Sequence, residues 1–189
     1  MRAEQLARAG AMRSLAALFS ADDPDVAALS GIDAGDALAT ATRFDREWAY
    51  RGRQALLWKR RMTAHAVHDF YLPVSALRPF DRRGLLCVDA DAGNVPLHLF
   101  ATQFAGGRTA IRDLRFARTA VRSVDGNVVL FISEPGSSRI GFADAGLQSV
   151  VPAPKLAIWA RGFRLDVERY SEDEPGLGAV AVAHACATV

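Results

Sequence analysis

The chain has 189 residues, of which 50% are hydrophobic and 23% are charged, and its net charge is +2. This length fits one ordinary domain with a large core, and this balance of residues is typical of a folded protein rather than a disordered one. The small net charge does not predict a polyanionic partner.

Targeting signals and cysteine chemistry are sparse. No run of eighteen apolar residues occurs, so no membrane-spanning helix is expected. The first residues form an Arg-bearing amphipathic pattern without the long apolar segment of a secretory signal, which predicts a cytoplasmic protein. Cys87 and Cys186 lie in apolar, strand-like runs, and we expect buried free thiols there rather than a disulfide or a metal pair.

The first third of the chain alternates helical and strand patterns. Residues 3–20 carry a helical apolar stripe that predicts packing on the protein's own sheet; a membrane surface is the alternative. A short buried strand over 26–32 precedes a helix capped by Asp33 or Asp36. Residues 48–50 and 55–60 read as a hairpin joined by RGRQ, and 67–73 read as a strand that Pro73 ends.

The central stretch, residues 84–118, reads as strand, turn, strand, loop and helix. Residues 84–90 are an apolar run, and Asp91 to Asn94 form a turn cluster. Residues 95–104 are largely apolar at both odd and even positions, which lie on opposite faces of a strand. The second strand is therefore expected to be covered on both faces. Residues 108–121 then show helical spacing of apolar side chains.

The remaining residues read mainly as strands. Residues 128–133 form an apolar run, turn residues occur at 144–146, and two short strands flank Arg161 and Gly162. An acidic loop is expected over 171–178 before an apolar strand closes the chain. No repeat or long linker divides the sequence, so we expect a single domain, 1–189, of α/β or α+β class, with mixed sheets and helices on their outer faces.

In order and spacing, these runs resemble the endonuclease/exonuclease/phosphatase family of metal-dependent phosphoesterases. The residues that carry the resemblance are five segments, namely Asp25–Gly31, Ala101–Phe104, Arg112–Arg115, the apolar run 128–132 with Ser133 to Pro135, and Leu156–Trp159, together with Gly176–Ala181 near the end. The resemblance implies a four-layer αββα sandwich of two mixed sheets flanked by helices. The N-terminal strand of the family is missing before the first helix.

The resemblance also implies a chemistry that this chain departs from at each position. The family uses a metal-binding Glu, a strand-end His, an Asp–Asn pair that holds water, and a closing Asp–His pair. Such groups neutralise the charge that develops on phosphate oxygens. At the matching positions this chain has Gly31, Gln103, Ser133 with Pro135 or Glu134, and Leu177–Gly178 or Gly178–Ala179. We therefore expect no catalytic residues and no bound metal.

Other residues could supply a site. His65 and His68 could share a helix face and bind a metal, although a strand is expected there. Asp89 and Asp91 are expected to cap a turn, and His98 and His184 to be hydrogen-bonded within strands. Gln103, Arg108, Arg112 and Arg115 are candidate anion-binding residues, with a solvated helix face as the alternative. Arg78, Asp81, Arg82 and Arg83 gather in a loop that is either solvated or an anion site.

Three functions remain open. The first is a catalytically degenerate member of this family that acts as a binding or assembly subunit, with a protein partner or by self-association. The second is an active Mg- or Mn-dependent phosphodiesterase or nuclease with displaced ligands drawn from Asp33, Gln103 and Glu134. The third is a phosphate or nucleic-acid binder that uses Arg112, Arg115 and the loop from Arg78 to Arg83. The first function requires no cofactor, whereas the second requires Mg.

Overall fold

The computed structural model describes residues 3–71, 84–104, 109–133, 142–152, 155–174 and 178–186. Three helices and eleven strands follow one another in this part of the chain, together with one 3-10 turn. Their bounds are α1 (Ala3–Asp22), β1 (Val26–Ser30), α2 (Ala34–Arg43), β2 (Arg46–Arg51), β3 (Gln54–Lys59), β4 (Met62–Tyr71), β5 (Gly84–Ala92), β6 (Val95–Gln103), α3 (Thr109–Arg122), β7 (Asn127–Ser133), η1 (Ala143–Ala145), β8 (Gln148–Pro152), β9 (Leu156–Arg161), β10 (Arg164–Glu174) and β11 (Gly178–Cys186).

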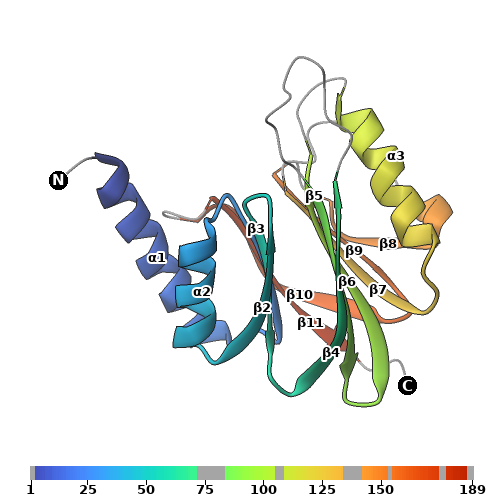
Figure 1. Cartoon of the computed structure of the whole chain (residues 1–189), viewed down its shortest axis with the longest axis horizontal. Helices are drawn as coiled ribbons and strands as arrows, with labels where there is room; N and C mark the ends of the chain where they lie inside the picture. Colours follow the sequence, from blue (N-terminus) through green and yellow to red (C-terminus); the bar gives the residue numbers. More distant parts are fainter. Residues whose placement is uncertain are drawn as a thin grey trace.

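The strands form two facing layers, with helices outside both (Figure 1). One layer is a six-stranded mixed sheet of order β4-β5-β6-β7-β9-β8, in which only β6 and β7 run parallel. The other layer contains the antiparallel sheet β1-β3-β2 and a separate β10–β11 hairpin. The expected α/β sandwich is confirmed, except that its second layer is divided and wholly antiparallel.

Three apolar clusters hold these layers together. Leu15 and Phe19 of α1 pack with residues of α2 against the outer face of the three-stranded sheet, which confirms the expected packing of the first helix. Leu56 and Trp58 of β3 face the six-stranded sheet across the middle of the molecule. The third cluster lies between α3 and the outer face of the six-stranded sheet, around Phe100.

Strand alternation assigns each face. In β3, Ala55 and Leu57 face the helices, whereas Leu56 and Trp58 face the other sheet. The period-2 pattern therefore divides one short apolar strand between two cores. β6 is buried on both faces only from Leu99 to Thr102, since its first residues are exposed, so the expected double cover holds for half of the strand.

Local signals placed most boundaries correctly. Asp33 is the N-cap of α2, and its side chain accepts a hydrogen bond from the backbone N–H of Asp36 at 2.9 Å. Gly146 ends η1 in the left-handed region, as the turn residues predict. Three expectations were wrong: β4 begins at Met62, five residues before the predicted start; β8 was not predicted; and β10 continues through Glu174 into the expected acidic loop.

None of the helices among the described residues combines the length and apolar character needed to cross a bilayer.

Candidate functional site

In five strands, the side chains that face the other sheet are apolar along most of the strand and polar at one end. These polar residues lie at the same end of the sandwich. In β3 the inward series runs from Trp58 through Leu56 to Gln54, and in β6 it runs from Leu99 through Ala101 to Gln103. The same alternation turns a polar residue inward at the end of β1, β2 and β7. We call this group the polar end; it consists of Ser30, Arg51, Gln54, Gln103 and Ser133.

Strand register brings the members of the polar end together. Gln54 of β3 is paired with Ser30 on one side and with Arg51 on the other. In the facing sheet, Gln103 of β6 is paired with Ser133 of β7, and these two strands are parallel. The polar end therefore lies at the carboxyl ends of β6 and β7, where an open α/β sheet places ligands.

Gln54 joins the two sheets. Its side chain is 2% exposed. With its amide oriented to satisfy both neighbours, Nε2 donates to the carbonyl oxygen of Ala101 at 3.0 Å, and Oε1 accepts from the backbone N–H of Gln103. A buried amide satisfied on both atoms fixes the approach of the three-stranded sheet to the end of β6.

Arg51 makes a second connection between the sheets. Its Nη1 lies 2.7 Å from Oδ2 of Asp69 on β4, and its guanidinium lies 3.8 Å from the centroid of the Tyr71 ring. Gly84 leaves room for this side chain, because a Cβ there would lie 3.1 Å from Cγ of Arg51. Nη2 of Arg51 is buried, and none of the described residues offers it a hydrogen-bond acceptor.

Arg53 lies in the tight turn between β2 and β3. Its backbone is in the left-handed region, with a φ of 69°. Its Nη2 donates to the carbonyl oxygen of Gly31 at 3.1 Å, and its backbone N–H donates to Oη of Tyr50 at 3.2 Å. Gly31 matches the metal-binding Glu in the family resemblance, so a guanidinium contacts the backbone at that position.

A divalent metal ion does not fit the described residues of this end. Gly31 has no side chain, and its carbonyl oxygen accepts from Arg53. The Asp69 carboxylate is held by Arg51. Mg²⁺ takes oxygen ligands that usually include a carboxylate, and a fixed guanidinium repels it. Within the described ranges, no group of three or more His, Cys, Asp or Glu side chains has an arrangement that could hold a metal ion.

The predicted anion-binding residues do not all meet at the polar end. Gln103 belongs to it. Arg112 and Arg115 are exposed on α3, which covers the outer face of the six-stranded sheet, away from the space between the sheets. Arg108, Glu134, Pro135, Leu177 and the loop from Arg78 to Arg83 lie outside the described residues. Anion binding by Gln103, Arg108, Arg112 and Arg115 stays a prediction.

Sequence reasoning missed Arg51, Arg53 and Gln54. The sequence contained a usable signal, because RGRQ joins two strands whose alternating apolar residues face the other sheet. Continuing that alternation to the strand ends turns Arg51 and Gln54 inward. RGRQ is predicted as a simple connection when the two-residue alternation of the flanking strands is not extended into these four residues.

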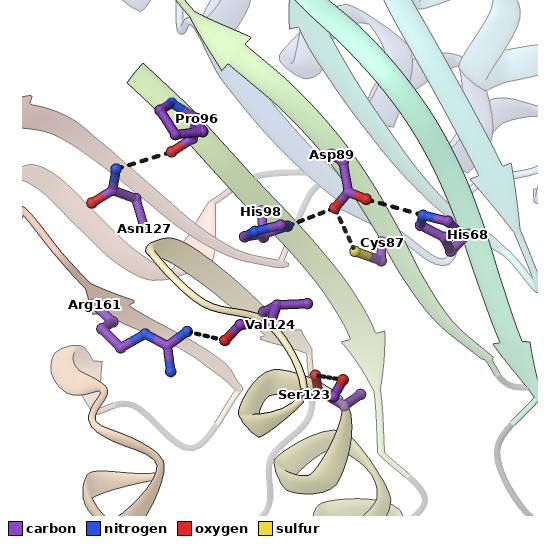
Figure 2. Close-up of polar contacts among 10 residues, drawn as sticks. His68, Cys87, Asp89, Pro96, His98, Ser123, Val124, Asn127 and Arg161 are labelled. Carbon is purple, nitrogen blue, oxygen red and sulfur yellow. Dashed lines mark hydrogen bonds and ion pairs between the residues drawn. The ribbon is translucent and has the colours of Figure 1, made fainter. Parts of the chain in front are cut away.

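A second polar cluster lies on the outer face of the six-stranded sheet, across β4, β5 and β6 (Figure 2). The Asp89 carboxylate sits between two imidazoles, with Oδ1 2.6 Å from Nδ1 of His98 and Oδ2 3.0 Å from Nε2 of His68. Next to it, Oδ2 of Asp91 lies 2.6 Å from Nε2 of His65. Burial disfavours the charged carboxylate of Asp89, yet the hydrogen bonds from His98 and His68 outweigh it and lower its pKa.

This cluster corrects the predicted turn-capping role of Asp89 and Asp91. Both residues lie within β5, and alternation places their side chains on one face, where they contact histidines of neighbouring strands. His65 and His68 lie on β4 rather than on a helix, and each contacts a different carboxylate. Cys87 is a buried free thiol, as expected, and burial with the neighbouring Asp89 raises its pKa.

Comparison with known proteins identifies the fold. No family model matches the sequence, and no curated protein does. The structure is similar to that of TDP2 from Caenorhabditis elegans, with a TM-score of 0.68 and 13% identity over 94% of this chain and 68% of that one. It is also similar to the human Nocturnin catalytic domain with a bound sulfate anion, with a TM-score of 0.66 and 9% identity over 93% of this chain and 86% of that one.

A third similar structure is an endonuclease/exonuclease/phosphatase family protein from Bacteroides thetaiotaomicron. Its TM-score is 0.70, with 10% identity over 90% of this chain and 82% of that one. Sequence identities this low support a shared architecture but not a shared site chemistry. The two facing sheets, the outer helices and these similarities together show that this chain has the endonuclease/exonuclease/phosphatase fold.

Proposed function

We propose that this protein is a catalytically degenerate form of the endonuclease/exonuclease/phosphatase fold that acts as a binding or assembly subunit. The observation that carries the proposal is the contact of the Arg53 guanidinium with the Gly31 carbonyl oxygen. In the family resemblance, the side chain at this position would hold a divalent cation. A guanidinium placed there disfavours a cation and favours an anion.

The contacts of the polar end support the same proposal. Gln54 and Arg51 extend from one sheet to the other, and their hydrogen-bonding groups are directed at backbone atoms of β6 and at Asp69. In the family resemblance, this end of the sandwich holds the groups that bind a metal, an attacking water and a proton donor. Here its described side chains connect the two layers, which supports a fold retained as a scaffold with a surface that recognises another molecule.

The test is turnover by the purified full chain. Bis(p-nitrophenyl) phosphate and p-nitrophenyl phosphate are incubated with the protein and Mg²⁺ or Mn²⁺, next to a divalent-metal phosphodiesterase as a positive control. We expect no rate above that of buffer with metal. The proposal fails if turnover is removed both by EDTA and by Glu134→Ala, because that result identifies the active metal-dependent enzyme with displaced ligands.

The assembly role has its own test. Size-exclusion chromatography with light scattering measures the molar mass over a range of protein concentrations. A mass that rises from one chain of 20.4 kDa to a defined multiple supports self-association. A single-chain mass at every concentration leaves a different protein as the partner and excludes self-association.

A further inference from the structure

The helix α3 carries four arginines on the side that faces away from the sheet (Figure 1). Its apolar side, around Ala117 and Val121, packs on the outer face of the six-stranded sheet. Side chains three and four residues apart are neighbours on a helix, so the arginines form a continuous line along the opposite side. We call this line the arginine row; it consists of Arg112, Arg115, Arg118 and Arg122.

The arginine row accounts for the net charge of the whole chain. The sequence contains 23 Lys and Arg residues and 21 Asp and Glu residues. Asp113 and Asp144 are the acidic residues of α3 and of the neighbouring η1. When these two and the four arginines are set aside, 19 basic and 19 acidic residues remain, which leaves no net charge elsewhere. The net positive charge is therefore confined to one short helix.

Asp144 shows how a carboxylate binds to this row. Its Oδ2 lies 3.1 Å from Nη1 of Arg118 and 2.9 Å from Nη2 of Arg122. The same Nη2 of Arg122 donates to the backbone carbonyl oxygen of Asp144 at 2.8 Å. Two guanidinium groups one turn apart thus meet at a single carboxylate oxygen. The row continues from there through Arg115 to Arg112, about 9 Å farther along the helix axis.

The middle of the row has the features of a protein-binding surface. Arg115 is exposed, and no carboxylate pairs with it within the described part of the chain. Ile111, one turn earlier on the same side of the helix, is 54% exposed. Arginine is enriched at protein–protein interfaces, and an apolar side chain beside it gains little from a sugar–phosphate backbone. The combination favours a protein partner over a nucleic acid.

We propose that the arginine row is a docking surface for an acidic segment of a protein partner, whose carboxylates bind along the row as Asp144 does. Guanidinium forks match carboxylates. Alternate side chains of an extended segment are about 6.6 Å apart, close to the separation of about 5–6 Å between neighbouring positions along a helix face. One acidic segment can therefore reach successive arginines. This inference rests on the proposed function, since it names the surface and the partner chemistry of the binding subunit.

The test is fluorescence anisotropy of a labelled polyglutamate peptide titrated with the full chain at about 0.1 M salt, where charges are screened beyond about 10 Å. A polyglutamine peptide of the same length is the neutral control. We expect saturable binding of polyglutamate alone, which weakens as salt is added. Arg115→Ala should weaken this binding by about two- to fivefold, the effect of one exposed ion pair. Arg115→Glu should weaken it further.

Asp144→Asn has the opposite expected effect. It removes the carboxylate that Arg118 and Arg122 share, so both guanidinium groups can bind the peptide, and the affinity should rise by about two- to fivefold. Asp45→Asn is the matched control, because it makes the same change of charge and also releases an arginine, Arg60, from an ion pair of 2.7 Å. Asp45 follows α2 in the other layer, so this variant should leave the affinity unchanged.

Circular dichroism and the Tm check that each variant is folded; if Asp144→Asn does not fold, the two Arg115 variants decide the test. Absence of saturable polyglutamate binding overturns the proposal, and so does binding that Arg115→Ala leaves unchanged. An equal gain of affinity in Asp144→Asn and Asp45→Asn would show an effect of net charge alone and would also overturn it. So would an oligothymidylate of equal charge that binds more tightly than polyglutamate and is weakened by Arg115→Ala, since that result assigns the row to nucleic acid.

The two proposals can fail separately. Turnover with a metal would reject the degenerate function whether or not polyglutamate binds. Absence of both turnover and polyglutamate binding would leave the degenerate function standing and reject only this docking surface.

Discussion

Replacement of Gln54 by alanine tests whether one buried amide ties the two sheets together. The substitution removes both inter-sheet hydrogen bonds and leaves the Ala101 carbonyl oxygen and the Gln103 N–H at the end of β6 without these partners. Each buried hydrogen bond contributes about 0.5–1.5 kcal/mol net. The loss of both bonds, together with the cavity that the truncated side chain leaves, should lower the free energy of unfolding by about 3 kcal/mol.

The assay is urea unfolding followed by tryptophan fluorescence and circular dichroism. With an m-value of about 2 kcal/mol/M, a loss of this size moves the midpoint down by about 1.5 M. Gln148→Ala is the matched control, because Gln148 is exposed on β8 and its truncation should change stability by less than about 0.5 kcal/mol. If both substitutions shift the midpoint equally, Gln54 does not join the sheets and its assigned role at the polar end is refuted.

Three further predictions concern other parts of the structure. Hydrogen bonds from two histidines outweigh burial and lower the pKa of Asp89, so its ionised form stabilises the fold above the ordinary carboxyl pKa, and this contribution is lost as the pH falls through the lowered value. In urea unfolding at pH 6, Asp89→Asn should therefore be about 1 kcal/mol less stable than the unmodified protein. A difference in unfolding free energy that widens toward pH 3 would contradict this. Gly84→Ala should destabilise the protein by about 1–2 kcal/mol, because the added Cβ would lie 3.2 Å from the Phe70 carbonyl oxygen as well as close to Arg51. Gly10→Ala in α1 should stabilise the protein, because a Cβ there would meet nothing within 4 Å. The Tm of each variant measures whether stability falls or rises. Burial raises the pKa of the Cys87 thiol, so in a Cys186→Ser background it should react with Ellman's reagent only on unfolding; rapid labelling of the native protein would show that it is accessible.

The outer-face cluster around Asp89 shows why the predicted end of β5 falls two residues too early. Asp89 and Asp91 stand just before Gly93, and this composition is typical of a turn. The strand continues through Ala92 because β4 and β6 pair with β5 on both sides up to its end. α3 and its apolar cluster cover Leu85 and Cys87 on this face, and the polar pairs of Asp89 with His98 and His68 follow along the same strand.

The polar end shows that contacts between distant strands cannot be predicted from local sequence patterns. Alternation within β2 and β3 is local, so the sequence contains the information that Arg51 and Gln54 point inward. It contains no local information that Gln54 meets the backbone of β6, about fifty residues away, or that Arg53 meets Gly31. Those contacts depend on the strand order of each sheet and on how the sheets stack.

The sequence alone determined most of the helices and strands in their order and most of their boundaries, and its resemblance to the endonuclease/exonuclease/phosphatase family implied the sandwich architecture. The elements follow from period and capping signals that act within a few residues, such as the Asp33 cap. Only the tertiary structure decided that the second layer is divided between β1-β3-β2 and β10–β11, and that the guanidinium of Arg53 contacts Gly31, which the resemblance matches to a metal-binding residue. Both outcomes depend on pairing between distant segments, which is fixed by packing across the whole domain rather than by local preference.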